Sequence, residues 1–116
     1  MTPQDNRREP VADVRRGTLD LLILKALSLE PMHGWAIAQR LEQLTEDALR
    51  VGQGSLYPAL QRLEEKGWVD SDWRVTHENR RARYYELTAA GRRALGEETK
   101  EWRRYVAMVD VVLRTS

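Results

Sequence analysis

The chain has 116 residues, which is enough for one domain with a single hydrophobic core. Its formal net charge is only +1, so an interaction with nucleic acid must depend on where the basic residues lie and not on their total. It contains no cysteine, which excludes disulfides, thiolate metal sites and cysteine nucleophiles.

Residues 1–11 are polar, contain Pro3 and Pro10 and show no periodicity, which predicts a mobile N-terminal arm. They lack the apolar stretch of a secretory signal. The longest apolar run of the chain, LDLLILKALSL, is interrupted by Asp20 and Lys25 and is too short to span a bilayer. We therefore expect a cytoplasmic protein without a membrane partner.

Two helices are predicted over about 13–29 and 34–44. The first is apolar around most of its circumference, so we expect it to be buried on several sides. Pro31 ends it, because the residue before a proline avoids the helical conformation. The second helix carries an apolar stripe that we expect to face the core, made of Trp35, Ile37, Ala38, Leu41 and Leu44.

A third helix is expected to begin with Ser55 as its N-cap and to end at Gly67. Pro58 then lies in the first turn, where its missing N–H breaks no helical hydrogen bond. No acidic residue occurs from 48 to 63, so the positive end of the helix dipole is open to an anion. The pattern predicts that this helix enters a DNA groove. The residues expected to contact DNA are Gln53, Ser55, Tyr57, Pro58, Gln61 and Arg62.

The period then changes to two, which predicts strands over 69–75 and 81–87 joined by a turn at 77–80. The odd positions of the first strand are expected to point inward: Val69, Ser71, Trp73 and Val75. A basic cluster at and after the turn, Arg80, Arg81 and Arg83, predicts a second DNA contact. Thr88 is expected to cap a last, long helix.

This order of elements is typical of a mainly α fold, a winged helix-turn-helix. We expect three helices and a β-hairpin wing over 12–88, followed by a dimerisation helix over 89–116.

Each basic or polar cluster alone has an ordinary explanation, because caps, half-buried tyrosines and solvated arginines are common. Together they favour double-stranded DNA over the alternative, a winged-helix module that binds only protein and would carry acids there. An enzyme is not expected, since His33 and His77 lie in different elements and Glu64 and Glu65 are adjacent and do not face each other. We expect no metal site and no cofactor.

The last helix carries an apolar seam at heptad spacing, formed by Leu95, Trp102, Val106, Val109 and Leu113. We expect this seam to pair with a second copy of the chain in a homodimer, although part of it can pack on the first helix of its own chain. Trp102 fits two roles that the residues alone leave open. It is either an anchor of the dimer interface or the wall of an aromatic ligand pocket.

The stretches GTLDLLILKAL, HGWAIAQRLE, GQGSLYPALQRLEEKGWV and RRARYYELTAAGR closely resemble the PadR family of transcriptional regulators, over about 16–113. The single closing helix is similar to the shorter branch of that family. One departure is Trp35, where the family more often has tyrosine.

The resemblance implies a dimeric repressor that binds a palindromic operator and is released by a small molecule, here expected to be aromatic. It also implies a pocket at the dimer interface beside Trp102. On this chain we expect the pocket to be formed by Arg15, Leu19, Thr99, Trp102 and Val106.

Overall fold

Four helices and a three-stranded antiparallel sheet make up the computed structural model, which describes residues 16–115. The helices are α2 (Arg16–Leu27), α3 (Gly34–Leu44), α4 (Gln53–Glu65) and α5 (Ala89–Arg114). The strands are β1 (Met32–His33), β2 (Val69–Val75) and β3 (Arg81–Leu87), in the sheet order β1-β3-β2. This is the mainly α winged helix-turn-helix with a long C-terminal helix that the sequence predicts. The expected arm over 1–11 and Arg15 lie outside the described residues.

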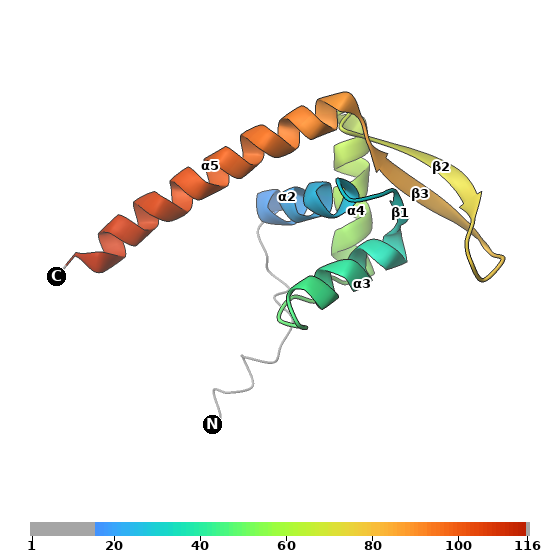
Figure 1. Ribbon diagram of the computed structural model, residues 1–116, viewed down its shortest axis with the longest axis horizontal. Helices are drawn as coiled ribbons and strands as arrows, with labels where there is room; N and C mark the ends of the chain where they lie inside the picture. The colour runs from blue at the N-terminus through green and yellow to red at the C-terminus, as the bar shows by residue number, and fades with distance from the viewer. Residues whose placement is uncertain (1–15, 116) are drawn as a thin grey trace, which may run out of the picture.

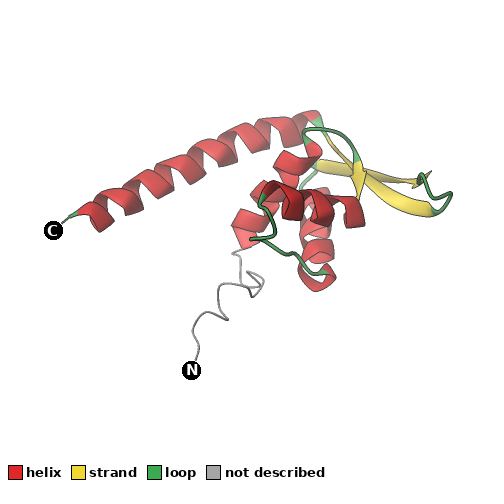
Figure 2. Cartoon of the chain, turned by 60° about the horizontal axis from the view of Figure 1, so that its bottom comes forward, coloured by secondary structure: helices red, strands yellow, loops and turns green. Residues whose placement is uncertain are grey.

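Helices α2, α3 and α4 form the body of the domain, while the β2–β3 hairpin and α5 project from it at opposite ends (Figure 1, Figure 2). Helix α2 contacts α3, α4, α5 and β3, which explains why its sequence is apolar on nearly every side. The side chains that fill the centre are fully buried: Ile23, Leu24, Leu27, Ile37, Leu56, Leu60, Leu63 and Val69. Burial of each such residue contributes about 1.5–3 kcal/mol relative to exposure.

Helix α4 ends as the sequence predicts, at a glycine in the left-handed conformation. Gly67 has φ +79°, and its N–H bonds to Glu64 while the N–H of Trp68 bonds to the carbonyl of Leu63. These two bonds satisfy carbonyls of the last turn in a Schellman motif. Thr88 then caps α5, accepting from the N–H of Gly91 at 3.0 Å and donating to the carbonyl of Gly67 at 2.7 Å. The cap therefore also joins the end of α4 to the start of α5.

The start of α4 differs from the prediction. Gly52 is the N-cap, and its carbonyl accepts from the N–H groups of Ser55 at 3.1 Å and Leu56 at 3.0 Å. The prediction of Ser55 as N-cap is therefore wrong, because the helix begins three residues earlier, with Gly52 as its N-cap. Pro58 consequently lies inside the helix, in its second turn, where it leaves the carbonyl of Gly54 without the usual helical donor.

The wing is less buried than its strand alternation predicts, and α3 is less buried than its apolar stripe predicts. Trp73 is 55% exposed and Val75 is 62% exposed, because the hairpin extends past the core and only Val69 reaches it. On α3, Trp35 and Leu44 are likewise exposed, so the expected stripe reaches the core only in its middle.

The strand β1 has no sequence signal, since it is two residues long. It is defined by pairing of Met32 with Tyr85 and His33 with Tyr84.

Candidate nucleic-acid interface

Helix α4 presents one apolar and one polar face. Its apolar residues Leu56, Ala59, Leu60 and Leu63 are buried in the core. The polar face exposes most of the residues expected to contact DNA: Gln53, Ser55, Tyr57, Pro58 and Gln61. No acidic residue lies in the first turn, and Gly52 provides no side-chain cap for the free N–H groups there. The exposed start of α4 can therefore donate hydrogen bonds to an anion.

Tyr57 lies between α4 and α3. Its ring rests on Gly34, where an added Cβ would come within 2.7 Å of the tyrosine hydroxyl oxygen. The side chain nevertheless remains 43% exposed and lines a shallow groove of ≈ 240 Å³ together with Trp35 and Gln53. One side of Tyr57 thus packs on the neighbouring helix, and the other side is open.

Arg62 differs from the other residues expected on this face. Its guanidinium binds the carboxylate of Asp20 on α2 through Nη2–Oδ1 at 2.8 Å and Nε–Oδ2 at 3.5 Å. Asp20 is buried, with 8% of its surface exposed. The pair ties α4 to α2, so the charge of Arg62 is directed inward and compensated.

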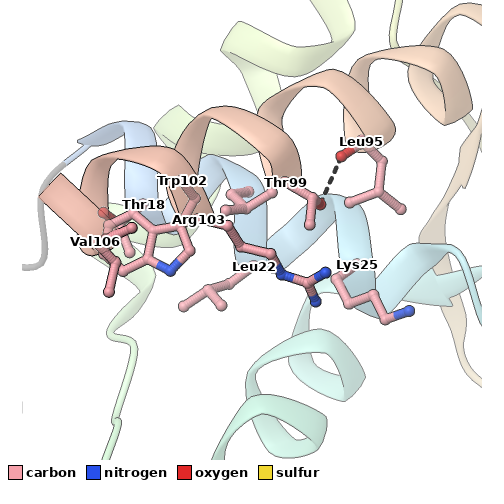
Figure 3. A pocket seen from close by; sticks show the side chains of 10 residues that line it. Thr18, Leu22, Lys25, Leu95, Thr99, Trp102, Arg103 and Val106 are labelled. Carbon is pink, nitrogen blue, oxygen red and sulfur yellow. Dashed lines mark hydrogen bonds between the residues drawn. The ribbon is translucent and has the colours of Figure 1, made fainter.

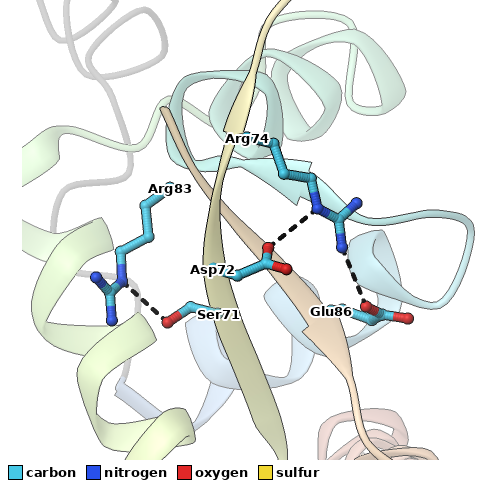
Figure 4. A network of polar contacts seen from close by, with 5 residues as sticks. All are labelled: Ser71, Asp72, Arg74, Arg83 and Glu86. Atoms are coloured by element: carbon cyan, nitrogen blue, oxygen red, sulfur yellow. Dashed lines mark hydrogen bonds and ion pairs between the residues drawn. The ribbon is translucent and has the colours of Figure 1, made fainter. Parts of the chain in front are cut away.

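The hairpin has two chemically different faces. We call the face turned toward α4 the inner face of the wing, formed by Ser71, Trp73, Arg81 and Arg83, and the opposite one the outer face, formed by Asp72, Arg74, Tyr84 and Glu86. On the outer face, Arg74 bonds to Asp72 at 3.0 Å and Glu86 at 3.3 Å, as Figure 4 shows. The positive charge of the outer face is therefore neutralised by its neighbours.

The inner face and the turn carry the three arginines expected to contact DNA, and these differ in whether other side chains of the domain bind them. Arg83 donates to the Ser71 hydroxyl at 2.9 Å and lies 3.7 Å from the carboxylate of Glu64 on α4. Arg80 and Arg81 form no ion pair among residues 16–115 and are exposed. The turn that presents them is closed by hydrogen bonds between Thr76 and Arg80.

Tyr85 marks where the inner face meets the core. Burial raises the pKa of its phenol above the ordinary value, and the nearby Arg83 partly offsets this effect. The phenol therefore stays protonated and neutral at physiological pH.

A second candidate site lies between α2 and α5. It is a pocket of ≈ 560 Å³, and Figure 3 shows the side chains that line it. It is lined by Thr18, Leu21, Leu22, Lys25, Leu95, Thr99, Trp102, Arg103, Val106 and Ala107. This volume is within the usual range for small-molecule sites. Three of the predicted residues line it: Thr99, Trp102 and Val106.

Leu19 does not line this pocket. It is 5% exposed and packs in the core, while Leu22 faces the pocket in its place. Sequence reasoning also missed Lys25 and Arg103, since their position at the pocket depends on the crossing of α2 and α5 and not on a local pattern.

The seam of α5 is only partly covered within one chain. Leu95 and Val109 are half-buried, whereas Trp102, Val106 and Leu113 are exposed at 42%, 43% and 74%. The helix is anchored to the domain at its start, where Gly91 and Ala94 are buried. The apolar surface therefore increases toward the C-terminal end of α5.

The profile of the transcriptional regulator PadR-like family matches residues 23–97, which include α3, α4, the wing and the start of α5. The chain belongs to the PadR-like family of transcriptional regulators.

Individual relatives agree with this assignment. The chain is 36% identical over 88 residues to a transcriptional regulator of Mycobacterium tuberculosis, covering 76% of this chain and 78% of that protein. A PadR family transcriptional regulator from Eggerthella lenta has a similar structure, with TM-score 0.73, 32% identity and coverage of 87% of this chain and 86% of that one. A transcriptional regulator from Clostridium thermocellum superposes with TM-score 0.77 at 27% identity, covering 85% and 96%.

Two further structural observations concern this PadR-like regulator. Over residues 16–115, no three His, Cys, Asp or Glu side chains are grouped closely enough to hold a metal ion. In the same part of the chain, no helix combines the length and apolar character needed to cross a membrane.

Proposed function

We propose that this PadR-like regulator is a sequence-specific DNA-binding repressor that acts as a homodimer on a palindromic operator. The observation that carries the proposal is the exposed, acid-free start of α4 together with the uncompensated Arg80 and Arg81 of the wing. In winged helix-turn-helix proteins these two elements are the ones placed to meet a duplex. The exposed amide and hydroxyl groups of Gln53, Ser55 and Gln61 suit base edges, while arginines suit phosphates.

Two of the expected contact residues have modified roles in this proposal. Arg62 supports the interface without contacting DNA, because its bond to Asp20 sets the position of α4 on α2. Arg83 links the wing to α4 through Glu64, so its charge is partly compensated before DNA is bound. Pro58 stiffens the second turn of the exposed helix and offers an apolar contact.

The exposed seam of α5 supports the homodimer. Trp102, Val106, Val109 and Leu113 repeat at coiled-coil spacing on a helix that projects from the domain (Figure 1). A two-fold dimer would place two copies of α4 for half-sites about 34 Å apart, one helical turn of DNA.

We further propose that a small aromatic molecule bound between α2 and α5 releases the repressor from DNA. The pocket is mostly apolar and is walled by Trp102, whose indole can stack on a planar ring. Because the same residue lies on the α5 seam, a ligand there would alter the spacing of the two protomers and of their α4 helices.

The DNA-binding proposal is tested by incubating the purified protein with sheared genomic DNA and sequencing the fragments that it retains. We expect enrichment of fragments sharing a palindrome whose half-sites are spaced by about one helical turn or a multiple of it. Failure to enrich any fragment over bulk DNA would contradict the proposal and favour a module that binds only protein.

The effector proposal is tested by titrating a panel of planar aromatic compounds while following tryptophan emission. Quenching and loss of DNA binding should both be strongly reduced in Trp102→Leu. This control is needed because Trp35, Trp68 and Trp73 also emit. Quenching that persists undiminished in the variant would place the pocket elsewhere.

A further inference from the structure

The indole of Trp73 is a prominent aromatic group on the inner face of the wing. It stands in the middle of β2, and 55% of its surface is exposed. The hairpin has no core beneath it at this point, since Val75 on the same face is even more exposed. Packing in the hydrophobic core therefore does not account for a tryptophan at this position.

Two arginines lie over this ring. The guanidinium carbon of Arg81 is 5.2 Å from the ring centre, and that of Arg83 is 5.8 Å away. Both distances fall within the range of a cation–π attraction. The strand register produces the arrangement, because Trp73 pairs directly with Arg83, and the next residue on that face, Val75, pairs with Arg81.

The two arginines differ in what else holds them. Arg83 also bonds to Ser71 (Figure 4) and approaches Glu64, so polar contacts as well as the indole set its direction. Arg81 has no ion pair among the described residues, and the indole is the group that orients it. The positive charge of Arg81 consequently stays available while its direction is restricted.

We propose that Trp73 is a positioning residue of the DNA interface, which holds Arg81 and Arg83 toward the α4 side of the wing for contact with phosphates. This inference rests on the proposed DNA binding. An exposed arginine loses rotamer freedom when it binds a phosphate, which weakens the complex. The indole removes part of that cost by restricting the arginine before DNA arrives.

The test uses the full-length protein and a fluorescent duplex of mixed sequence, about three helical turns long, near physiological salt. We expect Trp73→Leu to weaken binding about fivefold, which corresponds to losing one or two exposed cation–π contacts. Trp73→Phe keeps an aromatic face and should lose only about twofold. Equal affinity of Trp73→Leu and wild type would overturn the inference.

Salt dependence separates positioning from direct contact with phosphate. Trp73→Leu keeps every charge, so its log–log slope against salt should match that of the wild type, whereas Arg81→Ala should lower the slope by about one. Arg74→Ala is the matched control, since it removes an arginine from the outer face that Asp72 and Glu86 already neutralise. Its slope should be unchanged.

A double-variant comparison shows whether Trp73 acts through arginine. On an Arg81→Ala background, Trp73→Leu should weaken binding by about twofold or less, because the main partner is already gone. A full fivefold loss on that background would contradict the proposed role. If the wild type binds neither this duplex nor any genomic fragment, the proposed function fails; if it binds DNA and only the Trp73 effects are missing, the inference alone fails.

Discussion

At the scale of single residues, the proposed DNA interface includes side chains that are fixed by contacts with other elements of the domain. Arg62 shows this, because it lies on the helix expected to enter DNA yet binds a buried carboxylate on another helix. Removing the partner of such a pair leaves an uncompensated charge away from water, which destabilises the domain. Its function is therefore examined best through the stability of the domain.

Replacing Asp20 by asparagine should lower the free energy of unfolding by about 2–3 kcal/mol, since it leaves the guanidinium of Arg62 half-buried and without its charged partner. Urea unfolding at a fixed protein concentration measures this change. The control is Glu101→Gln in the exposed Glu101–Arg104 pair, which should change stability by less than about 0.5 kcal/mol. Equal effects of the two variants would show that the buried pair does not stabilise the domain.

Tyr57 packs against Gly34 on one side and is exposed on the other, so it can contribute to stability, to DNA binding or to both. Tyr57→Phe keeps the ring against Gly34 and removes only the hydroxyl. We expect DNA binding to weaken by about 1 kcal/mol while the free energy of unfolding stays the same. Tyr84→Phe on the outer face of the wing should leave the affinity unchanged. A loss of stability with full DNA affinity would make Tyr57 a packing residue only.

At the scale of elements, close backbone contacts join α4, the wing and α5. Thr88 caps α5 and binds the carbonyl of Gly67, while the N–H of Thr88 bonds to the carbonyl of Trp68. Gly91 lies directly against that same carbonyl, so only a hydrogen atom fits there. The direction in which α5 leaves the domain is set by these contacts.

Gly91→Ala should therefore destabilise the protein by about 2–3 kcal/mol, because the added methyl group collides with the backbone of Trp68, which cannot move aside. Gly96→Ala on the same helix meets no atom within 4 Å and should stabilise it by about 0.5–1 kcal/mol. Thermal unfolding of the two variants measures the contrast. Similar shifts in both would mean that α5 can leave the domain at another angle.

At the scale of the whole molecule, α5 is a long rod whose apolar seam continues past the domain that carries it. The longest extent of the molecule is 56 Å, and the seam residue Leu113, which is 74% exposed, lies in the last turn of α5. The proposed homodimer would bury such a surface between two copies of the chain. The proposed function needs the second copy, since a palindrome is read by two α4 helices at once.

Val109→Glu places a charge on the seam and should dissociate the dimer at micromolar concentration, with loss of operator binding. Val111→Glu is the matched control, because residues two apart on a helix point in nearly opposite directions. Val111 is exposed and lies off the seam, so its variant should remain a dimer. Light scattering after gel filtration gives the mass directly. A dimer that survives Val109→Glu would exclude this seam as the interface.

The amino-acid sequence by itself determined the features that depend on neighbouring residues. The bounds of α3, β2, β3 and α5, the Thr88 cap and the left-handed Gly67 are confirmed. These follow from helical or strand periodicity and from capping chemistry, which act over a few residues. The family assignment also followed from short stretches of sequence and is confirmed.

Only the tertiary structure decided the features that join distant segments. Arg62 meets Asp20 across 42 positions of sequence, and β1 exists because Met32 and His33 reach β3. Leu22 rather than Leu19 faces the pocket because of how α2 crosses α5. An alternating pattern likewise predicts two faces of a strand but not whether a core lies beneath them. Partners of this kind are set by the packing of whole elements, which no local pattern records.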